Sequence, residues 1–349
     1  MLVEKDVSLQ PCNTFGIQAK AHVLVRVTSV QDVLDCVAQH PHWMQAQPLV
    51  LGGGSNLVLT GDVDRVVLKI DIMGRRLVAE TPTHWIAEAG AGECWHDWVD
   101  WTLAQGWPGL ENLALIPGTV GAAPVQNIGA YGLELQDRFH SLDAVDLFTG
   151  QTFTLDAAQC GFGYRDSVFK HLPAPGMGLQ GRAVITHVRF ALPKRWQPEL
   201  GYLDLARKAE EHGVAQPTAR QVFNWVCEVR RAKLPDPALL GNAGSFFKNP
   251  VVSAEQCADI IGREPKLVHY PMPDGSFKLA AGWLIDACGW KGKGVGNAAV
   301  YDKQALVLVN RGGREQPATG GEVMTLAQAI QTSVYERYGL RLEIEPVVV

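Results

Sequence analysis

Residues 49–59 read LVLGGGSNLVL, in which three successive glycines separate two short apolar stretches. The apolar stretches at 48–52 and 66–70 have the composition of buried β-strands. Residues without a Cβ let the backbone approach a ligand closely and can direct several N–H groups at one anion. The stretch is neither a G-x-G-x-x-G fingerprint nor a Walker loop, because the next expected element is not a helix and no Lys-Ser or Lys-Thr pair follows. Both a phosphate nest and a tight hairpin turn are compatible with it.

Strands and helices alternate on both sides of this stretch. Residues 22–27 are typical of a strand, and Ser29 and Asp32 have the spacing of a capping box that opens a helix to about residue 40. Further strands are expected at 85–90, 141–148 and 183–192, with a helix at 93–105. Residues 106–132 show almost no periodicity, and a passage this long inside a compact domain is usually functional.

The proline-containing stretch 193–200 is the expected linker to a new unit. Beyond it, helices are expected at 218–232 and 325–338, and a strand at 341–346.

The composition is that of an ordinary globular protein. A chain of 349 residues has room for two or three domains, and 47% hydrophobic with 19% charged residues excludes a disordered or low-complexity protein. With 31 Lys and Arg against 36 Asp and Glu, the net charge of −5 provides no field for a polyanion. No nucleic-acid partner is therefore expected.

The cysteines and the N-terminus indicate the compartment. The seven cysteines include no C-x-x-C pair, so we expect reduced thiols and no zinc site. The first ten residues, MLVEKDVSLQ, are not followed by an apolar signal region, and no stretch approaches the roughly 18 apolar residues of a membrane span. We expect a cytoplasmic protein without a membrane partner.

A second glycine-rich segment, IPGTVGAAPVQNIGAYG at 116–132, carries only two side-chain amides, Gln126 and Asn127. A segment so rich in small residues cannot build its own core, so we expect it to cover a flat, extended ligand with backbone groups. A structural connector is the alternative.

Two polar residues stand out as candidates for chemistry. Arg165, in GYRDSVFK (163–170), can make a bidentate contact with a carboxylate or phosphate, although a solvated surface Arg is the common alternative. Ser245, in GNAGSFFKNP (241–250), lies between a glycine turn and two Phe; a helix N-cap or a turn serine is the common alternative. No serine has the G-x-S-x-G context of a hydrolase nucleophile, and no histidines have H-E-x-x-H spacing, so Ser245 fits a hydrogen-bond or proton donor and no metal is expected.

Taken in order, six stretches resemble the UDP-N-acetylenolpyruvoylglucosamine reductase (MurB) family. They are LGGGSN (51–56), the glycine-rich segment 116–132, GYRDSVFK (163–170), KLPDP (233–237), GNAGSFFKNP (241–250) and AAGWLID (280–286). The resemblance covers essentially the whole chain, whereas LGGGSN alone is also similar to the wider vanillyl-alcohol-oxidase-like FAD family.

The resemblance implies an α+β protein. Two α/β subdomains, at 1–72 and 73–200, would form an FAD-binding fold of the vanillyl-alcohol-oxidase-like type. A C-terminal α+β domain at 215–325 would bind the substrate, and the helix and strand at 326–349 would return to the active site.

The resemblance also implies the reaction. Members of the family reduce UDP-N-acetylglucosamine enolpyruvate to UDP-N-acetylmuramate, a cytoplasmic step of peptidoglycan precursor synthesis. NADPH is the co-substrate that supplies the hydride, through non-covalently bound FAD, and a monomer is expected.

Site residues follow from the same match. Ser245 would protonate the enol intermediate, while Arg165 and Glu345 would stabilise its charge. Alternation along a strand would point Glu343 and Glu345 the same way, so it cannot decide between them. The ungapped match from Arg337-Tyr338 favours Glu345. Tyr202 is similar to the tyrosine that type I members fold over the nucleotide sugar, and the other substrate contacts would be Lys233, Asn249 and Gln304. The FAD contacts would be Gly52, Gly53, Gly54, Ser55, Asn56, Gly118, Thr119, Gly121, Ala122, Gln126, Asn127, Gly129 and Arg230.

Two other functions remain open at this point. A different FAD oxidoreductase on the same scaffold would explain LGGGSN and the segment 116–132, but not Ser245 together with Lys233 and Asn249. A non-catalytic flavin- or nucleotide-sugar-binding regulator would have no need of an intact proton donor.

Overall fold

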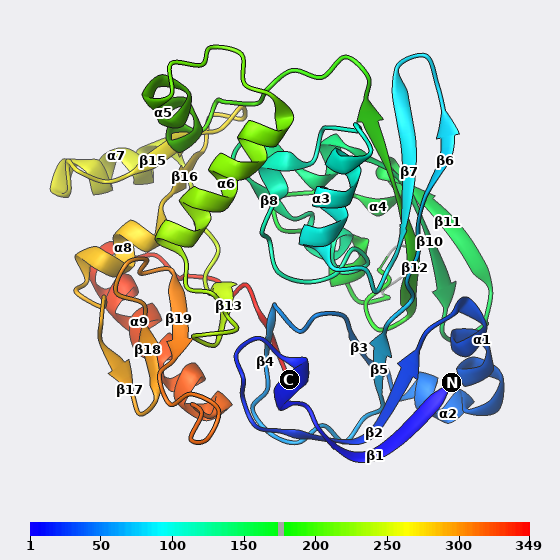
Figure 1. The fold of residues 1–349 in the computed structure, drawn as a ribbon. Coiled ribbons are helices and arrows are strands. Elements are labelled where there is room, and N and C mark those ends of the chain that lie inside the picture. The colour runs from blue at the N-terminus through cyan, green and yellow to red at the C-terminus, as the bar shows by residue number, and fades with distance from the viewer. Residues whose placement is uncertain (174–177) are drawn as a thin grey trace. The chain divides into compact units, whose positions relative to one another are not determined.

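The computed structural model describes residues 1–173 and 178–349, and the chain divides into two compact units. Unit 1 comprises Met1–Val7, Ala21–Gly53 and Val63–Ala232. Unit 2 comprises Ser8–Lys20, Gly54–Asp62 and Lys233–Val349. Each unit is therefore built from three stretches of sequence, and most of the strands and helices of both are labelled in Figure 1.

The first part of unit 1 is a four-stranded sheet in the order β1-β2-β5-β3, in which β2 and β3 both pair with β5 in parallel. Its elements are β1 (Leu2–Ser8), β2 (Lys20–Val27), α1 (Val30–Gln39), α2 (Pro41–Gln45), β3 (Leu49–Leu51) and β5 (Val67–Ile70). The expected capping box of α1 is confirmed, because the Ser29 hydroxyl accepts from the Asp32 N–H at 3.1 Å and Asp32 accepts from the Ser29 N–H at 3.1 Å. Val25, Val33 and Leu68 pack together in the core of this part.

The second part of unit 1 is an antiparallel five-stranded sheet in the order β11-β10-β12-β7-β6. Its strands are β6 (Arg75–Glu80), β7 (His84–Gly90), β10 (Phe139–Asp146), β11 (Thr152–Asp156) and β12 (Ala183–Pro193). Its helices are α3 (Trp95–Ala104), α4 (Ala157–Cys160), α5 (Leu203–Glu211) and α6 (Ala219–Lys233).

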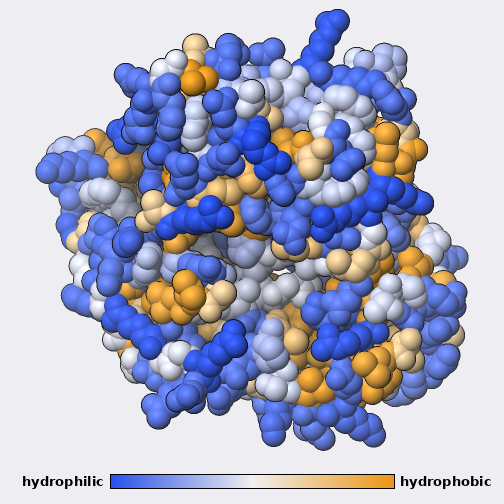
Figure 2. Space-filling model, in the orientation of Figure 1, coloured by the Kyte–Doolittle hydropathy of each residue, from blue (hydrophilic) through white to orange (hydrophobic). Residues whose placement is uncertain are grey.

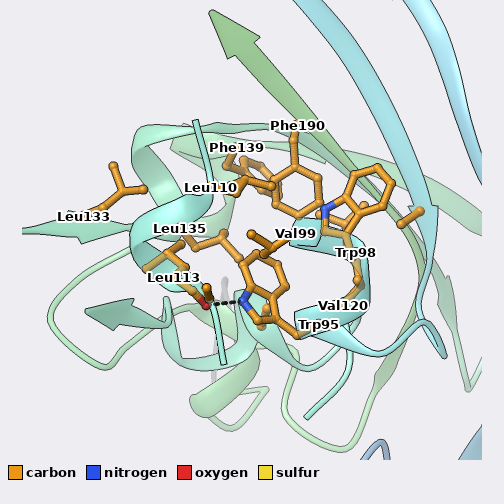
Figure 3. Packing of buried hydrophobic residues seen from close by; sticks show 14 of the residues in the cluster. Trp95, Trp98, Val99, Leu110, Leu113, Val120, Leu133, Leu135, Phe139 and Phe190 are labelled. Atoms are coloured by element: carbon orange, nitrogen blue, oxygen red, sulfur yellow. Dashed lines mark hydrogen bonds between the residues drawn. The ribbon is translucent and has the colours of Figure 1, made fainter. Parts of the chain in front are cut away.

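Aromatic side chains fill the core between this sheet and α3 (Figure 3). The rings of Trp95 and Trp98 are fully buried, and each lies 5.7 Å from the ring of Phe190 on β12. Trp95 also donates its indole N–H to the Leu113 carbonyl at 2.8 Å, the dashed line of Figure 3. Truncating such a side chain to Ala costs about 3–5 kcal/mol. Trp95 is thus a main anchor of the long passage that follows α3.

That passage, 106–132, was expected to be irregular and contains short elements. They are the 3-10 helices η2 (Glu111–Leu113) and η3 (Ala123–Gln126) and the strand β8 (Gly129–Ala130), which pairs with β9 (Leu133–Glu134).

Unit 2 is built around two small antiparallel sheets. One has the order β13-β19-β18-β17, from Asn242–Ser245, Val307–Asn310, Ala298–Val300 and Gly294–Val295. The other has the order β14-β16-β15, from Val251–Val252, Phe277–Leu279 and His269–Pro271. The helices are α7 (Ala254–Arg263), α8 (Ala281–Ala287) and α9 (Gly320–Tyr338).

One alternative and one expectation from the sequence were wrong. Residues 49–59 do not form a hairpin, because β3 pairs with β5 whereas β4 (Leu57–Val58) pairs in parallel with the C-terminal β20 (Val347–Val348). Residues 341–346 do not form a regular strand either. The Leu342 carbonyl accepts from the Gln331 side chain on α9, and only Ile344 forms an isolated bridge, with Phe247, so no continuous ladder develops.

The surface carries hydrophobic residues in small groups among hydrophilic ones on the face shown in Figure 2. Scattered exposed apolar side chains are normal for a folded protein. Among the described residues, no helix has the length and apolar character needed to span a membrane.

Candidate active site

The two glycine-rich segments of the sequence lie against each other in unit 1. A Cβ built on Gly53 would be 2.9 Å from the Gly118 Cα, and one on Gly52 would be 2.5 Å from the Thr119 hydroxyl oxygen. Side chains at these positions would therefore force the two backbones apart. The close approach of two glycine-rich backbones is the kind of cradle expected for a phosphate-containing ligand.

The backbone at the start of α3 holds the second segment in place. The Trp95 N–H donates to the Gly118 carbonyl at 3.1 Å, and the Val120 N–H donates to the Glu93 carbonyl at 2.9 Å. A Cβ on Gly121 would be 2.4 Å from the Ala91 Cβ, so this glycine is required for the contact. Sequence reasoning did not single out Trp95, because an apolar residue at a helix start has the same appearance whether it supports a core or a site.

Asn127 shapes the far end of the segment. It has a left-handed φ of 43°, and its buried side-chain amide donates to the Glu134 carboxylate at 2.9 Å and to the Gly163 carbonyl at 3.1 Å. Its side-chain oxygen accepts from the Gln136 N–H at 3.0 Å. The side chain is thus used inside the protein, where it joins the segment to the GYRDSVFK stretch.

Arg165 lies at a tight turn beside this segment. An antiparallel bridge between Gly163 and Asp166 closes the turn, and Arg165 itself has a left-handed φ of 56°. Its guanidinium donates to the Gly129 carbonyl at 3.3 Å. A charged residue held in a strained conformation next to a glycine-rich segment is typical of a functional position.

Arg230 supplies a buried cation in unit 1. Its Nε–H is buried and has no hydrogen-bond partner among residues 1–173 and 178–349. Burial lowers the pKa of Arg230, and burial also raises the pKa of Tyr131 to about 12, partly countered by the charge of Arg230. An unsatisfied buried guanidinium N–H is costly unless an anion occupies the site. The buried guanidinium of Arg230 therefore fits a bound anion.

Tyr202 precedes α5 and is partly exposed. Its ring lies edge-on to that of Tyr131, with centroids 5.1 Å apart. The segment before it is held by Asn112, whose side-chain amide donates to the Glu199 and Tyr131 carbonyls at 2.9 and 2.8 Å. A tyrosine is thus presented next to the end of the segment 116–132.

In unit 2, Ser245 is the last residue of β13. It pairs with Val307 of β19, while the next two residues, Phe246 and Phe247, are buried. No helix begins at Ser245, so the N-cap alternative does not apply. The neighbouring Gly244 has a φ of 71°, and its N–H donates to the Asn242 side chain at 2.9 Å. Strand pairing and the two Phe therefore fix the backbone that carries the hydroxyl.

Glu345 lies on the segment beside Ser245. Its N–H donates to the Phe246 carbonyl at 3.0 Å, and the Asn56 side chain donates to the Glu345 carbonyl at 3.3 Å. The two candidate glutamates are in different surroundings: Glu345 is buried, whereas Glu343 is exposed and forms an ion pair with Lys248. The expectation that both point the same way was wrong, because residues 341–346 are not a regular strand.

Asn249 and Gln304 converge on the first turn of α8. The Asn249 side-chain oxygen accepts from the Ala281 N–H at 2.9 Å. A Cβ on Gly282 would be 2.8 Å from the Gln304 side-chain oxygen, so this glycine leaves room for Gln304. Lys233 is the last residue of α6, and the following Pro235 carbonyl accepts from the Asn242 side chain of β13 at 3.3 Å.

The remaining residues of the first glycine stretch belong to unit 2. Gly54 has a φ of 62°, and a Cβ there would be 2.0 Å from the Cys12 carbonyl oxygen. Its own carbonyl accepts from the Thr14 N–H at 3.1 Å. Ser55 and Asn56 continue toward β4. The candidate set is therefore distributed, with Arg165, Tyr202 and Arg230 in unit 1 and Ser245, Glu345, Asn249 and Gln304 in unit 2.

Comparison with known proteins identifies relatives over the whole chain. A family model described as FAD binding domain matches residues 21–156, and one described as UDP-N-acetylenolpyruvoylglucosamine reductase, C-terminal domain, matches residues 236–349. UDP-N-acetylenolpyruvoylglucosamine reductase of Azoarcus sp. (strain BH72) is 54% identical over 100% of this chain and 98% of its own. That of Burkholderia mallei (strain NCTC 10229) is 55% identical over 98% of this chain and 96% of its own.

A solved structure agrees with the sequence matches. UDP-N-acetylenolpyruvylglucosamine reductase (MurB) from Thermus caldophilus superimposes with a TM-score of 0.67 at 26% identity, over 100% of this chain and 99% of that one. The expected FAD-binding fold with a further C-terminal α+β domain is confirmed.

Proposed function

The chain belongs to the UDP-N-acetylenolpyruvoylglucosamine reductase family, and we propose that Ser245, Arg165 and Glu345 carry out the proton transfer and charge stabilisation of its reaction. The protein is an FAD-dependent oxidoreductase that reduces UDP-N-acetylglucosamine enolpyruvate to UDP-N-acetylmuramate with NADPH, a step of peptidoglycan precursor synthesis. When bound, FAD supplies the hydride that is added to the enolpyruvyl double bond.

The chemistry of the substrate defines what the protein must provide. Hydride addition at the terminal carbon leaves negative charge next to the substrate carboxylate, and the adjacent carbon then takes up a proton. The charge requires positioned hydrogen-bond donors or cations, and the carbon requires a proton donor within reach.

Ser245 is the proposed proton donor. A serine hydroxyl is a weak acid, so it can serve only a strongly basic carbanion-like acceptor and only when it is held close to it. The fixed backbone at the end of β13 supports this role, since strand pairing with Val307 and the buried Phe246 and Phe247 restrict where the hydroxyl can lie.

Glu345 and Arg165 are the proposed stabilisers of the developing charge. The observation that carries the proposal is the hydrogen bond from the Glu345 N–H to the Phe246 carbonyl, which places the backbone of the buried residue Glu345 beside the strand end that carries Ser245. A carboxyl group in its neutral form can donate a hydrogen bond to an enolate. The guanidinium of Arg165 supplies the positive charge.

The proposed substrate and cofactor contacts follow from the match to the family. Lys233, Asn249 and Gln304 would bind the diphosphate and enolpyruvyl groups, and Tyr202 would cover the nucleotide sugar, as in the type I members of the family. FAD would be held by the backbone of residues 52–56 and 118–129 and by Arg230, whose buried Nε–H needs an acceptor.

The proposed parts of the chain keep the boundaries expected from the sequence. Residues 1–72 and 73–200 would hold FAD, residues 215–325 the substrate, and residues 326–349 would complete the site. We also propose a cytoplasmic monomer without nucleic-acid or membrane partners. Light scattering of the protein as it elutes from a sizing column would test the monomeric state, and a mass of twice 38.0 kDa would contradict it.

One experiment tests the function directly. The purified protein should show a flavin spectrum that bleaches with NADPH and recovers when the enolpyruvyl sugar is added. Bleaching without recovery would indicate a different FAD oxidoreductase on the same scaffold. A flavin that NADPH does not bleach would indicate a binding protein without this activity.

A further inference from the structure

His96, in the first turn of α3, contacts the backbone just before the second glycine-rich segment. The Leu115 N–H donates to the His96 Nδ1 at 3.0 Å. A ring nitrogen that accepts a hydrogen bond carries no proton, so this contact requires neutral His96 with its proton on Nε2.

Leu115 is a residue that needs such support. It has a left-handed φ of 59°, which is unfavourable for a side chain with a Cβ and persists only where the surroundings impose it. Trp95, the residue before His96, holds the chain on both sides of Leu115. Its indole N–H donates to the Leu113 carbonyl, and its backbone N–H donates to the Gly118 carbonyl. Between these two anchors, the bond from the Leu115 N–H to His96 Nδ1 is a bond that protonation of the ring would break.

The surroundings of the ring keep it neutral. His96 stacks on Phe223 of α6, with centroids 5.3 Å apart and planes at 9°. Burial lowers the pKa of His96; Arg230 and Arg231 of α6 act in the same direction, and Asp97 and Asp100 of α3 oppose them. The guanidinium of Arg220, also on α6, lies 4.8 Å from the Phe223 ring centre.

We propose that His96 is a positioning residue for FAD binding: by accepting the Leu115 N–H, it holds the strained turn from which residues 116–121 extend. The inference rests on the assignment of residues 118–122 to FAD under Proposed function. Protonation of Nδ1 would replace the acceptor with a donor that faces another donor. FAD should therefore bind more weakly at acidic pH than at neutral pH.

The direction of the pH effect follows from the lowered pKa. Because folding disfavours the protonated ring, the contribution of the bond is fully present above the ordinary His value of roughly 6.5. It is lost as the pH falls through the lower value of the folded state.

The test measures release of FAD from diluted holoenzyme between roughly pH 5 and pH 8, through the fluorescence of the released flavin. His96→Phe keeps a ring against Phe223 but lacks the acceptor, so its FAD should dissociate about tenfold more readily at pH 8. His96→Asn keeps an acceptor that does not titrate, so it should retain FAD at pH 8 and lose the pH dependence of the parent. His42→Asn, at an exposed position on α2, should behave as the parent does.

Two results would overturn the inference: an affinity of His96→Phe equal to that of the parent at every pH, or a His96→Asn variant with the pH dependence of the parent. If His96→Phe fails to fold, the pH dependence of FAD release from His96→Asn alone decides whether the inference holds. Gly53→Ala separates this inference from its premise. If Gly53→Ala retains FAD like the parent, the assignment of the cradle is wrong; if it loses FAD while His96→Phe does not, only the role of His96 is wrong.

Discussion

Glu345 donates its backbone N–H to the carbonyl oxygen of Phe246 at 3.0 Å, so the C-terminal segment lies directly beside the residue that follows Ser245. The same segment exposes Glu343, two residues earlier, and pairs it with Lys248. One short stretch of chain therefore contains a buried candidate for chemistry and an exposed matched control.

Glu345→Gln should lower the rate at which the enolpyruvyl sugar is reduced by about 10²-fold or more, which is the range for losing a group that stabilises a developing oxyanion. Glu343→Gln should stay close to the parent, because an exposed ion pair contributes about 0–1 kcal/mol. Steady-state kcat with the enolpyruvyl sugar measures both. Equal losses in the two variants would indicate damage to the segment, and a loss confined to Glu343→Gln would reverse the assignment.

FAD should be bound non-covalently. Covalent attachment in the wider scaffold family uses a His or Cys near the flavin, and neither residues 51–59 nor residues 116–132 contain one. Acid precipitation should leave the yellow colour in the supernatant. Colour in the pellet would contradict this, and Cys94, which forms a bridge with Thr119, would then be the first attachment site to examine.

Gly53→Ala should lower FAD content, because its Cβ would be 2.9 Å from the Gly118 Cα and neither backbone can yield without opening the cradle. Gly61→Ala is the matched control, since a Cβ at Gly61 would meet nothing within 4 Å. The ratio of flavin to protein absorbance after purification compares them. A fully loaded Gly53→Ala would show that the contact does not serve the cofactor.

NADPH and the nucleotide sugar should alternate in overlapping parts of one site. The sequence offers a single set of proposed anion-binding residues, namely Lys233, Asn249 and Arg165. Initial-rate plots at several fixed sugar concentrations should therefore be parallel, with inhibition by excess sugar. Intersecting lines, which indicate a ternary complex, would contradict the shared site.

The features that the sequence predicted well were local ones. The Ser29 and Asp32 capping box and the apolar strands depend on neighbouring residues, so spacing alone was sufficient to find them.

The features that the sequence did not predict depend on partners far along the chain. That β4 pairs with β20 rather than with β3 is decided by residues almost 300 positions away, and no local pattern carries that information. The surroundings of Glu343 and Glu345 differ because Phe246 and Lys248 bind the segment separately, which strand alternation could not anticipate. The left-handed conformation of Leu115 could not be predicted from the sequence either, since Leu has no preference for that conformation.

Ser245→Ala, followed by rapid mixing of each half-reaction, tests the central claim most directly. Reduction of the flavin by NADPH needs no proton from the protein, whereas quenching of the enol intermediate does, so the two half-reactions should separate. Flavin reduction and FAD content should match the parent, and formation of UDP-N-acetylmuramate should fall by about 10²–10⁴-fold, the range for one well-placed general acid. Formation of product at the parent rate would contradict the account, as would failure of both half-reactions with loss of FAD.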